Sequence, residues 1–201
     1  MFNWKISIFL IIFTFQISFT SETNLFYNAI LNLNVESIEK YLIDNANILK
    51  KFDPFESTFF GKIECLPIHV AISTQNLCII DLLMKYGANC ESKDSQERYP
   101  IHHAIATGNL DVVKHLVEKY SVNIDEDSRS CIAFCERYKN EIMVGEKKFL
   151  GSSISIKTNE INIIKEYFEK RLEYRNILKL SFENKVDMPL ELQKLICTFL
   201  T

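Results

Sequence analysis

The chain has 201 residues, 47% of them hydrophobic, which is enough to bury the core of one domain. Its formal net charge is −3, and no stretch of it forms a basic stripe. Nucleic acids are held mainly by clustered lysines and arginines, so this charge argues against a nucleic-acid partner.

The first predicted element is a short apolar segment at the amino terminus. Residues 1–20 read MFNWKISIFLIIFTFQISFT, with Lys5 ahead of an apolar run from Ile6 to Phe15. Ser18 and Thr20 then supply small residues ahead of a cleavage point. This layout predicts a signal peptide over residues 1–20 and a secreted or periplasmic protein, with no membrane contact after cleavage. The alternative is an uncleaved membrane anchor, although the run is about half of the roughly 20 residues that a spanning helix needs.

The next feature is a pattern that starts at Leu66 and recurs 33 residues later, at Tyr99. The copies read LPIHVAISTQNLCIIDLLMKYGAN and YPIHHAIATGNLDVVKHLVEKYSVN. The recurring pairs are Pro67 and Pro100, Ile68 and Ile101, His69 and His102, Ala71 and Ala104, Asn76 and Asn109, and Leu77 and Leu110. A fixed period of this size indicates stacked units that bury their apolar faces against one another.

The two copies resemble the ankyrin repeat, in which T-P-L-H-x-A and G-A-D-x-N segments recur at this period. The resemblance implies an all-α solenoid of helix pairs that binds other proteins. In this family a Thr precedes the Pro, whereas this chain has Leu66 and Tyr99 there. A helix cap is worth about 1 kcal/mol, so we expect a less stable stack with the same fold.

Fainter copies flank this pair and predict an ankyrin-repeat domain over residues 24–172. Its four helix pairs are expected at residues 24–49, 66–92, 99–125 and 130–172. The first copy lacks the Pro and the His, as a capping repeat can. Between the first two, Lys50–Glu64 is expected to be a long connecting finger. Its phenylalanines are expected to pack back on the stack, and the alternative is an exposed apolar patch at an interface.

The end of the chain, residues 173–201, is predicted to form a short helix at Glu173–Phe182 and a final helix. Residues 186–200 (VDMPLELQKLICTFL) resemble the start of an F-box motif, with Met188 in place of the first Leu. The matching residues are Pro189, Glu191, Leu192, Ile196, Phe199 and Leu200. The same segment also fits an amphipathic helix that caps the solenoid. A cap is our preferred interpretation, and a recruitment element is the alternative.

The sequence contains no constellation that predicts catalysis, a cofactor or a metal. His69 and His102 occupy the motif histidine, which the resemblance implies is bonded to backbone groups, and His103 is expected to face the groove. There is no nucleophile elbow and no glycine-rich phosphate loop. Cys131 and Cys135 would share one helix face, but no histidine lies at a zinc-ligand spacing from them. The chain is therefore not expected to be an enzyme.

The resemblance implies that partner contacts come from the finger tips and the exposed positions of the inner helices. In the third repeat these candidate protein-binding residues are Lys93, Ser95, Gln96, Arg98, His103 and Thr107. The expected function is that of an exported ankyrin-repeat protein that binds another protein, as a host-directed effector. One alternative is an adaptor that brings a bound target to a ubiquitin-ligase complex through the F-box-like helix. Another is a periplasmic scaffold with only internal partners.

Overall fold

The computed structural model describes residues 22–57, 61–125, 130–143 and 154–184, together with Pro189, Leu190, Gln193, Lys194 and Cys197. The predicted signal peptide and most of the F-box-like segment lie outside the described residues. Within these ranges, no helix combines the length and the apolar character needed to cross a bilayer.

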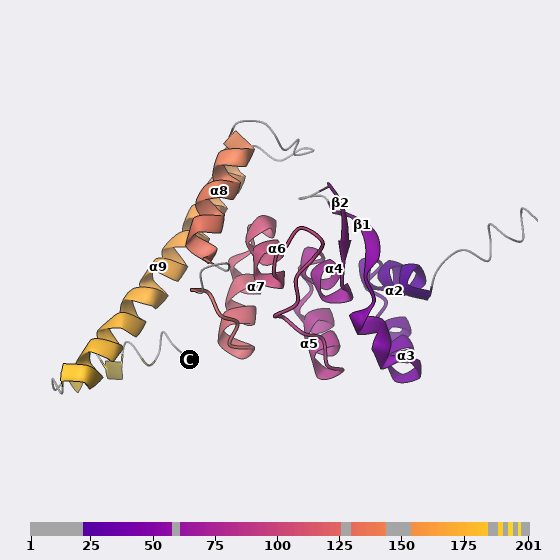
Figure 1. Ribbon diagram of the computed structural model, residues 1–201, viewed down its shortest axis with the longest axis horizontal. Coiled ribbons are helices and arrows are strands. Elements are labelled where there is room, and N and C mark those ends of the chain that lie inside the picture. The colour runs from indigo at the N-terminus through magenta and orange to yellow at the C-terminus, as the bar shows by residue number, and fades with distance from the viewer. Residues whose placement is uncertain are drawn as a thin grey trace, which may run out of the picture.

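Four helix pairs stand side by side along the described chain, as Figure 1 shows. They are α2 (Glu22–Leu31) with α3 (Val35–Asp44), α4 (Pro67–Ser73) with α5 (Leu77–Lys85), α6 (Pro100–Thr107) with α7 (Leu110–Lys114), and α8 (Cys131–Met143) with α9 (Ile154–Asn184). The inner helices α2, α4, α6 and α8 contact one another in that order. The predicted all-α repeat fold is confirmed.

The core of the stack lies where these helices meet. Ala71 and Ala104 are fully buried on the inner helices, where a small side chain lets neighbouring helices approach closely. The outer helices bury an apolar stripe at helical spacing, made by Ile80, Leu83, Val113 and Leu116. Neighbouring repeats therefore share one continuous core, as expected for a solenoid.

Each of the first three helix pairs turns through one residue in the left-handed region. These residues are Leu33 (φ 56°), Gln75 (φ 60°) and Gly108 (φ 76°), so only the third repeat uses the residue that adopts this conformation without strain. An asparagine follows in every case and accepts a hydrogen bond from a backbone N–H of the outer helix. These asparagines are Asn34, Asn76 and Asn109.

The segment between the first two repeats differs from the predicted loop, because it folds into a β-hairpin. After the 3₁₀ turn η1 (Ala46–Lys50), strand β1 (Asp53–Ser57) pairs in antiparallel fashion with β2 (Gly61–Cys65). Phe55 packs against the core as predicted, whereas Phe52 is 51% exposed. The other two phenylalanines of the segment, Phe59 and Phe60, lie outside the described residues.

The outer helix of the third repeat holds one extra residue. Leu83 and Leu116 are 33 residues apart, but Tyr86 and Tyr120 are 34 apart. The structure accommodates the insertion as a π-helical turn, η2 (His115–Lys119), directly after α7.

The final helix also differs from the prediction. We expected a break near residue 172 and a separate helix at Glu173–Phe182, but α9 is one helix of 31 residues. Its sequence has neither Gly nor Pro, so nothing in its backbone chemistry ends it earlier. Ile161, Ile164 and Phe168 bury its first half against the stack. The expected domain boundary at residue 172 therefore falls inside a continuous helix.

Candidate functional site

The finger that precedes α6 is organised by one buried carboxylate, that of Asp94, which is 3% exposed. Its Oδ1 accepts hydrogen bonds from the backbone N–H groups of Gln96 (2.8 Å) and Arg98 (3.0 Å). Its Oδ2 accepts a bond from Arg98 Nε and lies 2.9 Å from His103 Nε2. The finger is thereby folded down onto α6.

The charges around Asp94 follow from its neighbours. Burial would raise the pKa of Asp94, but hydrogen bonds from His103 and Arg98 and the charge of Arg98 outweigh burial and hold this pKa well below its usual range. Burial lowers the pKa of His103, so its ring is neutral and Nε2–H donates to the carboxylate. The Arg98 guanidinium beside it supplies a positive charge that balances the buried carboxylate.

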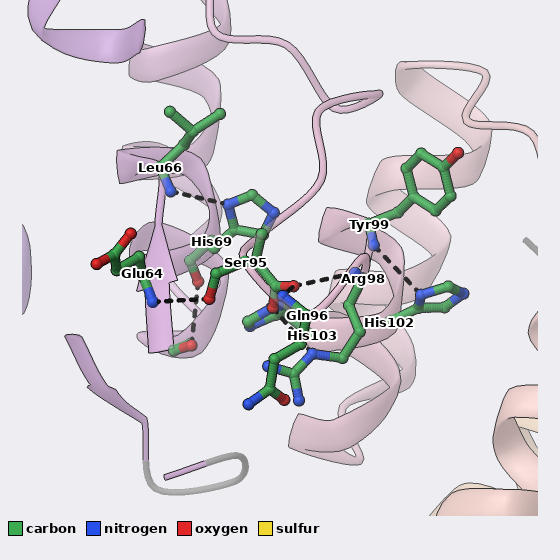
Figure 2. Close-up of polar contacts among 11 residues, drawn as sticks. Glu64, Leu66, His69, Ser95, Gln96, Arg98, Tyr99, His102 and His103 are labelled. Atoms are coloured by element: carbon green, nitrogen blue, oxygen red, sulfur yellow. Dashed lines mark hydrogen bonds and ion pairs between the residues drawn. The ribbon is translucent and has the colours of Figure 1, made fainter. Parts of the chain in front are cut away.

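His69 and His102 each accept a hydrogen bond from the backbone N–H of the residue that precedes their helix. His69 Nδ1 accepts a hydrogen bond from the backbone N–H of Leu66 at 3.2 Å, and His102 Nδ1 accepts one from that of Tyr99 at the same distance. Figure 2 shows both bonds, one at the start of α4 and one at the start of α6. A side chain three residues into the helix thus satisfies the N–H just outside it, as in a capping box.

His69 stays neutral in this position. Burial, and then the neighbouring His103, lower the pKa of His69 to about 3. The rings of His69 and His103 are in contact, with centroids 4.8 Å apart. An unprotonated Nδ1 is what the cap requires, so burial and capping support each other.

The six predicted contact residues do not form one exposed surface. Ser95 and Gln96 are exposed and Lys93 is partly exposed. Arg98, His103 and Thr107 are 9%, 0% and 4% exposed. The expectation that His103 faces the groove is wrong, because His103 lies beneath the finger and donates to Asp94.

The inner helix of the third repeat offers no side chain to a partner. Every residue of α6 is buried between its neighbours and the finger. Thr107 Oγ1 is occupied within the fold, since it donates to the carbonyl of Ala104 at 2.7 Å and accepts from the N–H of Asn109 at 3.2 Å. A partner of the folded chain therefore cannot reach the side chains of this helix.

What remains accessible is a row of side chains along the fingers, which we call the finger edge. It comprises Lys62, Glu64, Ser95, Gln96 and Glu97. The Glu64 N–H donates to Ser95 Oγ at 3.0 Å, as Figure 2 shows. The Ser95 N–H in turn donates to the Glu64 carbonyl at 2.9 Å. These two bonds join the finger to β2.

Glu97 was not among the predicted contact residues, and the Asp94 turn that positions it was not predicted. Glu97 has a positive φ of 59°, and its N–H bonds to the carbonyl of Asp94. Asp94 bonding to the backbone two residues on is a typical Asx turn, and the D-S-Q-E-R segment could have revealed it. Lys93 is held against this turn by its ion pair with Glu97 at 2.6 Å.

Three of the buried cysteines are held as unreactive thiols. All six are free thiols, and burial raises the pKa values of Cys65, Cys90 and Cys135 to about 12, which keeps them protonated. In the part of the chain that the structure describes, no three His, Cys, Asp or Glu side chains gather as metal ligands would.

The chain was compared with models of protein families. A family model described as ankyrin repeats (3 copies) matches residues 68–144, from α4 to the end of α8. The F-box-like segment lies outside the matched range. No curated protein matches the chain in a comparison of sequences.

Proposed function

Since the chain carries ankyrin repeats, which are protein-binding modules, we propose that it is an exported protein that binds another protein through its finger edge. The supporting observation is the pair of hydrogen bonds between Ser95 and Glu64, which sets the finger and β2 side by side. A surface held in place before binding loses less conformational entropy when the partner arrives.

Asp94, buried beneath this surface, also holds the finger in place. Its bonds to the N–H groups of Gln96 and Arg98 fix the backbone that carries the exposed Gln96 and Glu97 side chains. Because α6 is buried, the exposed side chains next to it belong to the finger edge. The proposed partner is therefore a protein that contacts the fingers from outside, with polar and charged groups at the contact.

Export is the second part of the proposal and rests on residues 1–20. The segment has a positive start, an apolar run and small residues before Ser21. An exported chain meets proteins of its surroundings, so we propose a host protein as partner. Amino-terminal sequencing of protein recovered outside the cell is expected to begin at or near Ser21. An intact Met1 in a membrane fraction would favour the anchor instead.

The binding proposal is tested by capturing proteins on the exported chain from host lysate and from its own lysate. Glu97→Lys reverses a charge on the finger edge, and its ion pair with Lys93 is exposed and contributes little to folding. Glu173→Lys makes the same change on the exposed face of α9 and is the control. The expected result is a partner lost with Glu97→Lys and kept with Glu173→Lys. A partner kept by both variants would place binding elsewhere.

A second candidate function is the adaptor, in which the F-box-like helix recruits a ubiquitin-ligase complex. The described residues of this segment are all exposed, and Leu190 is a large apolar side chain with 65% exposure. Truncation before Asp187 separates the two interpretations. Loss of a capping helix should lower the free energy of unfolding, since a buried Leu or Phe contributes roughly 1.5–3 kcal/mol. Loss of a recruitment helix should spare the fold and abolish one interaction.

A further inference from the structure

We propose that the finger at residues 91–98 opens away from α6 when its surroundings become acidic, and that a partner bound to the finger edge is then released. The contact between Asp94 and His103 is the part that responds to acid, and we call it the latch. Release of a partner rests on the proposed protein-binding function, whereas the opening of the finger does not.

The finger contains no apolar residue that would anchor it in the core. Residues 91–98 read ESKDSQER and lie between the buried Cys90 and Tyr99. A segment with few buried apolar contacts can open locally while the core beneath it stays folded. The polar bonds made by Asp94 and Ser95 therefore hold the finger closed.

The latch lies at the base of the finger, where water does not reach it. Asp94 Oδ2 and His103 Nε2 are 2.9 Å apart, and both side chains are 0% exposed. The His103 ring also contacts the His69 ring of α4, with centroids 4.8 Å apart. A proton added to His103 would create a second buried cation beside Arg98, with the Asp94 carboxylate as the counter-charge of both. The closed finger therefore disfavours the protonated ring.

The groups around His103 act in the same sense. Burial lowers the pKa of His103, Asp94 raises it by less, and Arg98 lowers it further. The other elements packed against α6 and the finger carry titratable groups that act elsewhere. These include Cys65 of β2 and Glu141 of α8, which act on Arg98, Lys114 of α7, which lies over the Tyr167 ring, and Glu160 of α9, which lies beside Gly108 at the end of α6.

Opening of the finger is linked to the uptake of a proton. It exposes His103 to water, where its pKa returns to the usual 6.5. Below pH 6.5 the open finger therefore binds a proton that the closed finger does not, so closure weakens as the pH falls. One such proton raises the ratio of open to closed finger roughly twentyfold between pH 7 and pH 5. Asp94, whose pKa is low in the closed finger, adds to this effect mainly below about pH 4.

Hydrogen exchange of the isotope-labelled exported chain measures this opening between pH 7 and pH 5. The amides of Gln96 and Arg98 bond to Asp94 Oδ1 and report the finger. The Ile80 amide bonds to the Asn76 carbonyl at the start of α5 and reports unfolding of the stack. After correction for the intrinsic exchange rate at each pH, we expect opening at Gln96 and Arg98 to rise roughly twentyfold from pH 7 to pH 5. It should exceed opening at Ile80 at every pH, because the stack stays folded.

Two histidine variants separate the latch from other effects of acid. His103→Gln keeps a donor for Asp94 but does not titrate, so opening of the finger should rise by at most about threefold over the same range. His115→Gln is the control, since His115 bonds to Asp81 between two outer helices, and it should leave the rise unchanged. If His103→Gln does not fold, the comparison with Ile80 in the unchanged chain still decides.

Three results would overturn the opening of the finger: no rise at Gln96 and Arg98, opening no greater than at Ile80, or an equal rise in His103→Gln. Release is tested by moving the complex captured at pH 7 to pH 5. We expect the unchanged chain to lose the protein that Glu97→Lys fails to capture, and His103→Gln to keep it. Retention by the unchanged chain would overturn release. If no captured protein depends on Glu97, the proposed function fails, while the exchange experiment still tests the latch.

Discussion

Asp94 and His103 form a hydrogen bond of 2.9 Å in which both side chains are completely shielded from solvent. This contact joins the tip of a finger to the middle of an inner helix, so the exposed part of the finger depends on a buried polar pair. Arg98 also bonds to Asp94. The Asp94 carboxylate is thus held inside a repeat whose sequence pattern predicts an apolar interior.

Removing the charge of Asp94 should destabilise the whole stack. Asp94→Asn leaves the buried Arg98 guanidinium without its counter-charge, which we expect to lower the free energy of unfolding by roughly 3 kcal/mol or more. Glu97→Gln is the matched control on the same finger and should change it by less than about 0.5 kcal/mol, because Glu97 is exposed. Urea unfolding measures both. Equal stabilities would mean that Asp94 does not balance Arg98.

A larger side chain at the junction between the second and third repeats should destabilise the fold. Ala104 is fully buried on α6, so Ala104→Leu should overpack the core by roughly 1–3 kcal/mol. Ala133→Leu adds the same atoms at an exposed position of α8 and should leave the melting temperature nearly unchanged. Thermal melts compare the two, and a harmless Ala104→Leu would show that the repeat register is wrong.

Leu33 and Gly108 occupy equivalent left-handed turns, and substitutions there should change the free energy of unfolding in opposite directions. Leu33 adopts φ 56° with 47% exposure, so Leu33→Gly should relieve strain and raise the free energy of unfolding by up to about 1 kcal/mol. Gly108→Ala should lower it by about 1 kcal/mol or more. Its φ of 76° is costly for alanine, and a new Cβ would lie 2.4 Å from Glu160 Oε2. Denaturant midpoints that move in one direction for both would contradict this account.

Acid should weaken the fold through His69. Its pKa in the folded chain is about 3, below the usual 6.5, so below pH 6.5 the unfolded chain binds a proton that the folded chain does not. Stability is therefore present above pH 6.5 and falls toward pH 3, by up to about 1.4 kcal/mol per pH unit. His103, whose pKa is also lowered, adds to this slope.

His69→Gln is the informative variant for this dependence. Glutamine three residues into a helix can accept the Leu66 N–H, as in a capping box, but it does not titrate. Between pH 7 and pH 4, the free energy of unfolding should fall less steeply with decreasing pH in His69→Gln than in the unchanged chain. The remaining slope is due to His103 and other groups. Identical slopes would mean that His69 is protonated in the folded state.

The sequence by itself determined the repeat architecture. Pro67, Ala71 and their copies 33 residues later are local requirements for starting a helix and for packing it closely, and the structure confirms the fold they predict. The extra residue between Leu116 and Tyr120 was also visible in the spacing, and the structure turns it into a π-helical turn. Such features depend on residues that are close along the chain, so they can be recognised from the repeat period of the sequence.

Only the tertiary structure decided which side chains a partner can reach. His103 and Gln96 are both polar and close in sequence, yet one is buried and the other exposed, because Asp94 folds the finger over α6. The strand at Asp53–Ser57 exists because Gly61–Cys65 pairs with it, and the finger bonds to the second strand through Ser95. These outcomes depend on contacts between segments that meet only after folding, so neither composition nor period contains them.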